Sequence, residues 1–112
     1  MAVSLTEQEF AQQVGTNFQL KLDQRSIELN LSEVKGYPSG PNEQTGMERF
    51  SVFFDGPADP FLPQSLYRLE HERMSEFDLF LVPVAKTDQG FRYEAVFNYF
   101  KERSEPPAVA GG

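Results

Sequence analysis

The chain has 112 residues, enough for one domain, and contains no cysteine, which excludes a disulfide framework, a thiolate metal site and a cysteine nucleophile. Seventeen acidic residues against ten basic ones give a net charge of −7 without a basic stripe, so we expect neither nucleic acid nor an anionic membrane as a partner. The chain opens without a secretory signal and has no apolar run of membrane-spanning length, so a cytoplasmic location is expected.

A short helix is predicted near the start of the chain, from about Glu7 to Val14. Thr6 is an N-cap residue, and Glu9 three positions later completes a capping-box pattern. Phe10 and Val14 lie four residues apart on one helix face. A helix this short is stable only when it packs on something else, so we expect that face to dock.

Two alternating apolar patterns follow the helix and predict a β-hairpin. Pairing Leu22 with Ile27 leaves residues 23–26 as the turn and places every apolar residue of the hairpin on one face. After Leu31 the apolar phase slips by one residue, which indicates a bulge near Ser32 or the end of the strand.

Further strands are predicted after a long mobile loop at residues 36–48, which is rich in glycine and proline. Their ranges are Phe50–Asp55, Ser65–Glu72, Phe77–Val84 and Phe91–Phe100.

The fold class predicted from these patterns is mainly β: a small antiparallel six-stranded meander barrel, or a strongly curved sheet, with a short N-terminal helix. An open sheet packed on the helix is the alternative. The domain is expected to span residues 4–103, followed by a disordered tail at 104–112. In the expected register Leu69 lies opposite Leu79, and Leu81 lies opposite Ala95. The residues expected to point inward are Phe18, Leu20, Leu22, Ile27, Leu29, Leu31, Phe50, Val52, Phe54, Tyr67, Leu69, Phe77, Leu79, Leu81, Tyr93, Ala95 and Phe97.

The segment Gly56–Gln64, named here the proline loop, contains three prolines that fix the backbone and remove hydrogen-bond donors. Phe61 and Leu62 are apolar residues within it. Either they plug the core beneath the loop, or they are offered to a partner.

The strand at Phe77–Val84 is apolar on both faces, because Phe80 and Val82 alternate with inward-facing residues. Phe80 is expected to face Val96 of the next strand. A half-solvated antiparallel sheet does not need such an outer face. Either the N-terminal helix covers it, or Phe80, Val82 and Val96 bind a second copy or another protein. Pro83 predicts an edge position or a bulge.

His71 is the only histidine, so a catalytic triad would need it. Glu70 and Glu72 beside it point to the opposite face of a strand and cannot converge with it. We expect His71 to be a satisfied residue at the barrel rim. No catalytic residue, metal ligand or cofactor is expected.

Several segments resemble an uncharacterised bacterial domain family of unknown function. They are FDGPADPFLPQ at 54–64, YRLEH at 67–71, LFLVPV at 79–84, YEAVFN at 93–98 and the opening LTEQEF at 5–10. The resemblance covers roughly residues 4–98 and implies a small free-standing domain beside phage tail-collar-like fibre proteins. The family tends to have a glycine in the turn where this chain has Met74-Ser75.

Two functional hypotheses follow. The first is a non-enzymatic interaction or accessory module, serving a phage-tail-like or tail-collar fibre assembly, that displays the proline loop and the outer face of Phe77–Val84. The second is a small-molecule-binding or hydrolytic barrel with a site at the rim near His71. The first predicts assembly without a deep pocket. The second predicts a concave polar pocket that brings His71 together with residues of other strands.

Overall fold

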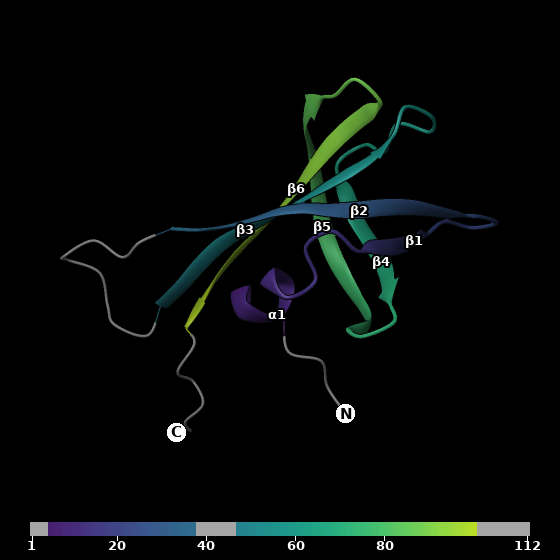
Figure 1. The fold of residues 1–112 in the computed structure, drawn as a ribbon. Coiled ribbons are helices and arrows are strands. Elements are labelled where there is room, and N and C mark those ends of the chain that lie inside the picture. Colours follow the sequence, from purple (N-terminus) through teal and green to yellow (C-terminus); the bar gives the residue numbers. More distant parts are fainter. Residues whose placement is uncertain (1–4, 38–46, 101–112) are drawn as a thin grey trace.

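Six antiparallel strands close into a barrel that a short helix precedes (Figure 1). The computed structural model describes residues 5–37 and 47–100. The elements are α1 (Glu7–Ala11), β1 (Asn17–Lys21), β2 (Ser26–Gly36), β3 (Met47–Pro57), β4 (Ser65–His71), β5 (Ser75–Lys86) and β6 (Gly90–Phe100). The predicted fold class is therefore confirmed. Most of the predicted loop at 36–48, and the tail at 104–112, lie outside the described residues.

The order of strands around the barrel is β1–β2–β3–β6–β5–β4. Strands β1 to β3 and strands β4 to β6 each follow one another as in a meander, but β3 lies beside β6 and β4 lies beside β1. The order is thus not that of one uninterrupted meander. β3 and β4 occupy opposite positions in the ring, so the connection between them, most of the proline loop, has to cross an end of the barrel.

Bulges occur near both positions for which the sequence allowed one, after Leu31 and at Pro83. The β2–β3 register shifts between Leu31 and Glu33, and the β5–β6 register shifts between Pro83 and Ala85. The pairing of β5 with β6, with Val82 opposite Glu94, is in the predicted register. At Pro83, the bulge accommodates a residue that cannot donate a ladder hydrogen bond.

Two other predicted registers are wrong by two residues. Leu20, rather than Leu22, lies opposite Ile27, and Leu69 lies opposite Phe77 instead of Leu79. Tighter turns than expected cause both differences. A shift of two residues keeps each side chain on its face, because the side-chain period of a strand is two.

Helix α1 plugs the barrel instead of covering its outer surface. The Thr6 side chain caps it by accepting a hydrogen bond from the Glu9 backbone N–H at 3.1 Å. The helix ends at Ala11, earlier than predicted, and a turn leads to Gly15, whose φ of +92° suits glycine. Phe10 is fully buried, whereas Val14, on the face expected to dock, is exposed.

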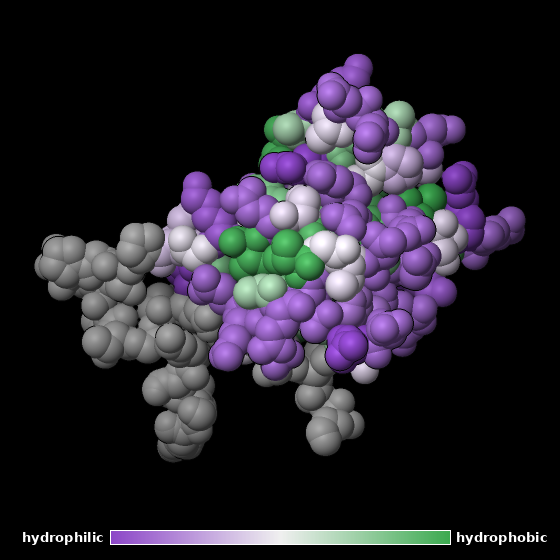
Figure 2. Space-filling model, viewed as in Figure 1, coloured by the Kyte–Doolittle hydropathy of each residue, from purple (hydrophilic) through white to green (hydrophobic). Residues whose placement is uncertain are grey.

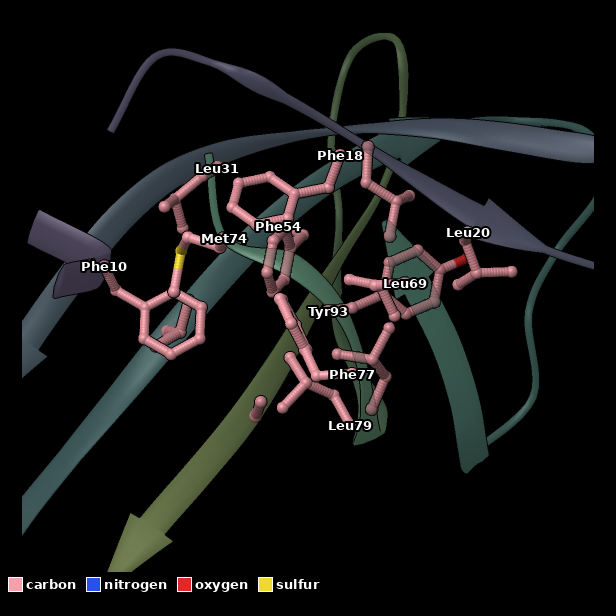
Figure 3. Packing of buried hydrophobic residues seen from close by; sticks show 14 of the residues in the cluster. Phe10, Phe18, Leu20, Leu31, Phe54, Leu69, Met74, Phe77, Leu79 and Tyr93 are labelled. Atoms are coloured by element: carbon pink, nitrogen blue, oxygen red, sulfur yellow. The ribbon is translucent and has the colours of Figure 1, made fainter. Parts of the chain in front are cut away.

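The aromatic ring of Phe10 fills one end of the core (Figure 3). Its centroid lies 5.5 Å from that of Phe97, 6.0 Å from Phe77, 6.2 Å from Phe50 and 6.5 Å from Phe18. Aromatic pairs at these separations add favourable contacts beyond area burial.

The barrel interior holds nearly all the residues predicted to point inward. Leu22, Tyr67 and Phe97 of that set are only partly buried. Phe10, Leu62 and Met74 join the core from outside the strands. The two-residue alternation was therefore sufficient to identify the strand residues of the core, but not the residues that close its ends.

Candidate functional site

Exposed apolar side chains lie on the outside of three neighbouring strands. Leu66 of β4, Phe80 of β5 and Val96 of β6 are 61%, 50% and 67% exposed. Leu66 lies directly opposite Phe80, and Val82 beside them is half-buried. We call these four residues the outer patch. Leu66 was not singled out in the sequence, although its position out of phase with the buried Leu69 was a usable signal.

The outer patch is not covered by α1. Helix α1 lies against β2, and its apolar side chain Phe10 points into the core. The helix-cover interpretation of the outer face is therefore wrong. The physical reason is that Phe10 gains more contacts inside an aromatic cluster than on an open strand surface.

Polar groups border the patch on the β3 side. Ser51, opposite Val96, is fully buried although it lies on the outer phase of β3. Its hydroxyl lies 2.9 Å from the Tyr37 hydroxyl and donates to a Glu94 carboxylate oxygen at 2.6 Å. Tyr37 thus covers the neighbouring stretch of β3, and the apolar surface ends at this hydrogen-bonded group.

On the β4–β5 side the border is charged. Arg68 lies opposite Asp78 and donates to its carboxylate at 2.6 Å, and it also pairs with Glu76 at 3.6 Å. These exposed ion pairs form a solvated charged border. An apolar surface with a polar rim is the arrangement found at many protein interfaces.

Much of the remaining surface is hydrophilic, in contrast to the outer patch. The face seen in Figure 2 is largely hydrophilic, with a compact hydrophobic area where α1 lies against β2. Apolar groups on a soluble domain gather into patches only rarely, so each patch is informative.

The proline loop anchors itself through Leu62. This side chain is only 2% exposed, and its backbone N–H donates to the buried Tyr93 hydroxyl at 3.0 Å. The Tyr67 hydroxyl donates to the Pro63 carbonyl. Leu62 therefore plugs the barrel end that the loop crosses, and its predicted availability to a partner is wrong.

Phe61 points the other way. It is 49% exposed, and its ring packs edge-on against Phe91 with centroids 4.9 Å apart. Phe91 is at the start of β6, five residues before Val96, which corresponds to about 16 Å along a strand. Phe61 is thus accessible, but it lies away from the outer patch.

His71 is held in one neutral form by its hydrogen bonds. Nδ1 accepts from the backbone N–H groups of Arg73 at 3.0 Å and Met74 at 3.2 Å, so Nε2 carries the proton. Nε2 donates to Thr16 Oγ1 at 2.9 Å, and Thr16 Oγ1 donates to the Gln13 carbonyl at 2.7 Å. Burial lowers the pKa of His71, in agreement with the neutral form. Both ring nitrogens are occupied, so the ring has no free acceptor for general-base chemistry.

An open polar hollow of about 750 Å³ surrounds His71. It brings together the connection after α1, β1 and the β4–β5 turn, and its lining includes Gln13, Thr16 and Gln19. Gln13 is 92% buried, and its side-chain amide has no hydrogen-bond partner within residues 5–37 and 47–100. This is the concave polar site that the second functional hypothesis required.

Glu70 and Glu72 also line this hollow, together with Glu76. Hydrogen bonds with Glu76 and Lys21 lower the pKa of Glu70, whose carboxylate lies 3.3 Å from the Lys21 ammonium. Within the described part of the chain, no cluster of histidine and carboxylate side chains could hold a metal ion, and no helix could span a membrane.

Comparison with known proteins identifies one relationship. A family model described as "Domain of unknown function (DUF6916)" matches residues 5–97. The match covers α1, all of β1 to β5 and β6 as far as Phe97. No curated protein and no solved structure matches the chain.

Proposed function

We propose that this chain, which belongs to the DUF6916 family of domains of unknown function, is a non-enzymatic module that binds a protein through its outer patch. The observation that carries the proposal is the exposure of Leu66, Phe80 and Val96, each at least half exposed, on three adjacent strands. Because these side chains stand on a barrel of paired strands, little additional ordering is needed when a partner covers them.

Covering the outer patch removes apolar area from water and so favours binding. Each 100 Å² of apolar area removed from water contributes roughly 2.5 kcal/mol. The charged border of Arg68 and Asp78 adds orientation more than affinity, because exposed ion pairs contribute little by themselves.

The setting proposed for this binding is an accessory role in a fibre-like or tail-like assembly. Its support is the resemblance of the proline-loop and strand segments to domains beside fibre proteins. Phe61 offers a second contact for such an assembly, because its exposed ring is fixed against Phe91.

Site-specific photocrosslinking in the native host tests the proposal. A photoreactive phenylalanine replaces Phe80 in one variant and the similarly exposed Val14 in the control variant. We expect a discrete crosslinked product from position 80 that is absent from position 14. Equal products from both positions, or none from position 80, would contradict binding at the outer patch.

A second candidate function is binding of a small polar ligand in the hollow beside His71. The observation that favours it is the buried Gln13 amide without a partner, since buried polar groups are normally hydrogen-bonded. A nuclear magnetic resonance screen with small amides and amines tests it. Saturable shifts of Gln13 and Gln19 in the unmodified chain support a ligand site if the Gln19 shift vanishes in Gln13→Leu. A hollow filled by water alone gives no saturable shift.

A further inference from the structure

The two ladders of β6 have very different lengths. Its ladder with β3 runs without interruption from Gly90 opposite Pro57 to Phe100 opposite Met47. Its ladder with β5 begins at Phe91 opposite Lys86 and ends at Glu94 opposite Val82. Within residues 5–37 and 47–100, no strand pairs with the second edge of β6 from Ala95 to Phe100.

Beyond their common ladder, β5 and β6 leave an opening between them. Side chains fill its inner side but not its outer side. Figure 1 shows β5 and β6 separating beyond their common ladder. The rings of Phe10, Phe77 and Phe97 pack together on the inner side. On the outer side Val96 is 67% exposed. The edge of β6 is therefore adjacent to the outer patch.

This edge lacks the usual protection against strand addition. Natural edge strands carry charges, prolines or bulges that prevent pairing with another chain. This stretch, Ala95–Phe100, contains no charged residue and no proline, and its ladder with β3 has no bulge. The facing stretch of β5 carries Glu76 and Asp78.

We propose that two copies of this chain pair through this edge, with the Ala95–Phe100 stretches of their β6 strands antiparallel about a two-fold axis. The inference rests on the proposed function, because it identifies the partner of the outer patch as a second copy. The β3–β6 sheet of one copy then continues into that of the other.

The charge pattern favours a second copy as the occupant. The whole chain carries −7, so two copies repel each other over most of their surfaces and can approach best where the surface is uncharged. The Ala95–Phe100 stretch has no charge to oppose. A two-fold axis places the stretch opposite itself, so every unpaired backbone group of one copy meets its complement in the other. Val96 lies within the new ladder, and its exposed side chain adds apolar contact.

Sedimentation velocity over a series of concentrations, together with residue-level hydrogen exchange, tests this inference on the full chain. We expect a monomer–dimer equilibrium, and amides of Ala95–Phe100 that become more protected as concentration rises. Val96→Lys should weaken dimerisation by about tenfold or more, because it brings a lysine of each copy close to the axis and replaces an apolar contact with a charge. The matched control Val14→Lys should leave it unchanged.

The outcomes separate the two proposals. A monomer at all concentrations overturns the dimer, while a discrete crosslink from position 80 to another protein still supports binding at the outer patch. A dimer without added protection at Ala95–Phe100 overturns strand pairing but keeps association by side chains. If Val96→Lys does not fold, hydrogen exchange of the unmodified chain and the variant Phe80→Lys decide the question.

Discussion

The backbone N–H of Leu62 donates to the hydroxyl of Tyr93 at 3.0 Å in the interior of the barrel. Tyr93 comes from β6 and is fully buried, so this bond ties the proline loop to a strand that follows it by about 30 residues. The loop is therefore a structural part of the barrel end. Only Phe61 extends from it toward solvent.

Tyr93→Phe should destabilise the fold by about 1–3 kcal/mol, because it leaves the buried Leu62 N–H without an acceptor. Chemical denaturation measures the change. Tyr67→Phe is the matched control. Its hydroxyl bonds the Pro63 carbonyl at an exposed site, where water can replace it. A loss as large for Tyr67→Phe would contradict the assignment of Tyr93 as the anchor.

The two apolar residues of the proline loop should respond differently to truncation. Leu62→Ala should cost about 2–5 kcal/mol, as expected for a buried leucine that leaves a cavity. Phe61→Ala should cost less than about 1.5 kcal/mol, since it loses mainly the edge contact with Phe91. Thermal and denaturant unfolding of both variants check the difference. Similar losses at both positions would show that Phe61 also belongs to the core.

Stability should fall as the pH drops below the ordinary histidine pKa of 6.5, because burial lowers the pKa of His71 in the folded state. Glu72 opposes this shift and Arg73 adds to it. The unfolded chain then binds the proton first, so stability present above pH 6.5 is lost as the pH falls through the folded-state pKa.

The physical cause is visible at Nδ1, which cannot accept from Arg73 and Met74 once it carries a proton. Denaturation of the wild type and His71→Gln at about pH 7.5 and pH 5 checks this prediction. We expect a larger loss on acidification in the wild type. Carboxylates titrate in both proteins, so equal losses would remove His71 as the cause.

Ser75→Gly should stabilise the fold by up to about 1 kcal/mol. Ser75 has a φ of +65°, a left-handed conformation that costs a residue with a side chain about 1–2 kcal/mol. The gain is partly offset by the greater entropy of glycine in the unfolded chain. Ser65→Gly in the extended β4 strand is the control and should be destabilising.

Much of the fold could be predicted because strand alternation is a local property. Phe18, Leu29 and Phe54 were placed inward correctly, since a period of two assigns faces without knowledge of the partner strand. The hairpin register of Leu20 and Ile27 was wrong because turn length is set by backbone geometry that several sequences satisfy.

The candidate site was only half predictable. Phe80 and Val96 were identified because they broke the alternation of apolar and polar residues on their strands. Leu66 entered the outer patch only through its pairing with Phe80. The buried amide of Gln13 had no signal in the sequence, since its burial depends on the turn that packs below α1.

The sequence by itself determined that this chain forms a barrel of short antiparallel strands with an aromatic interior, because propensity and alternation act over neighbouring residues. The tertiary structure alone decided that β3 lies beside β6, that Phe10 plugs the barrel, and that Leu62 is buried while Phe61 is exposed. Phe61 and Leu62 are adjacent and both apolar, so their own chemistry does not distinguish them. The available space distinguishes them, because the barrel end admits one side chain from the crossing loop and the other remains in solvent.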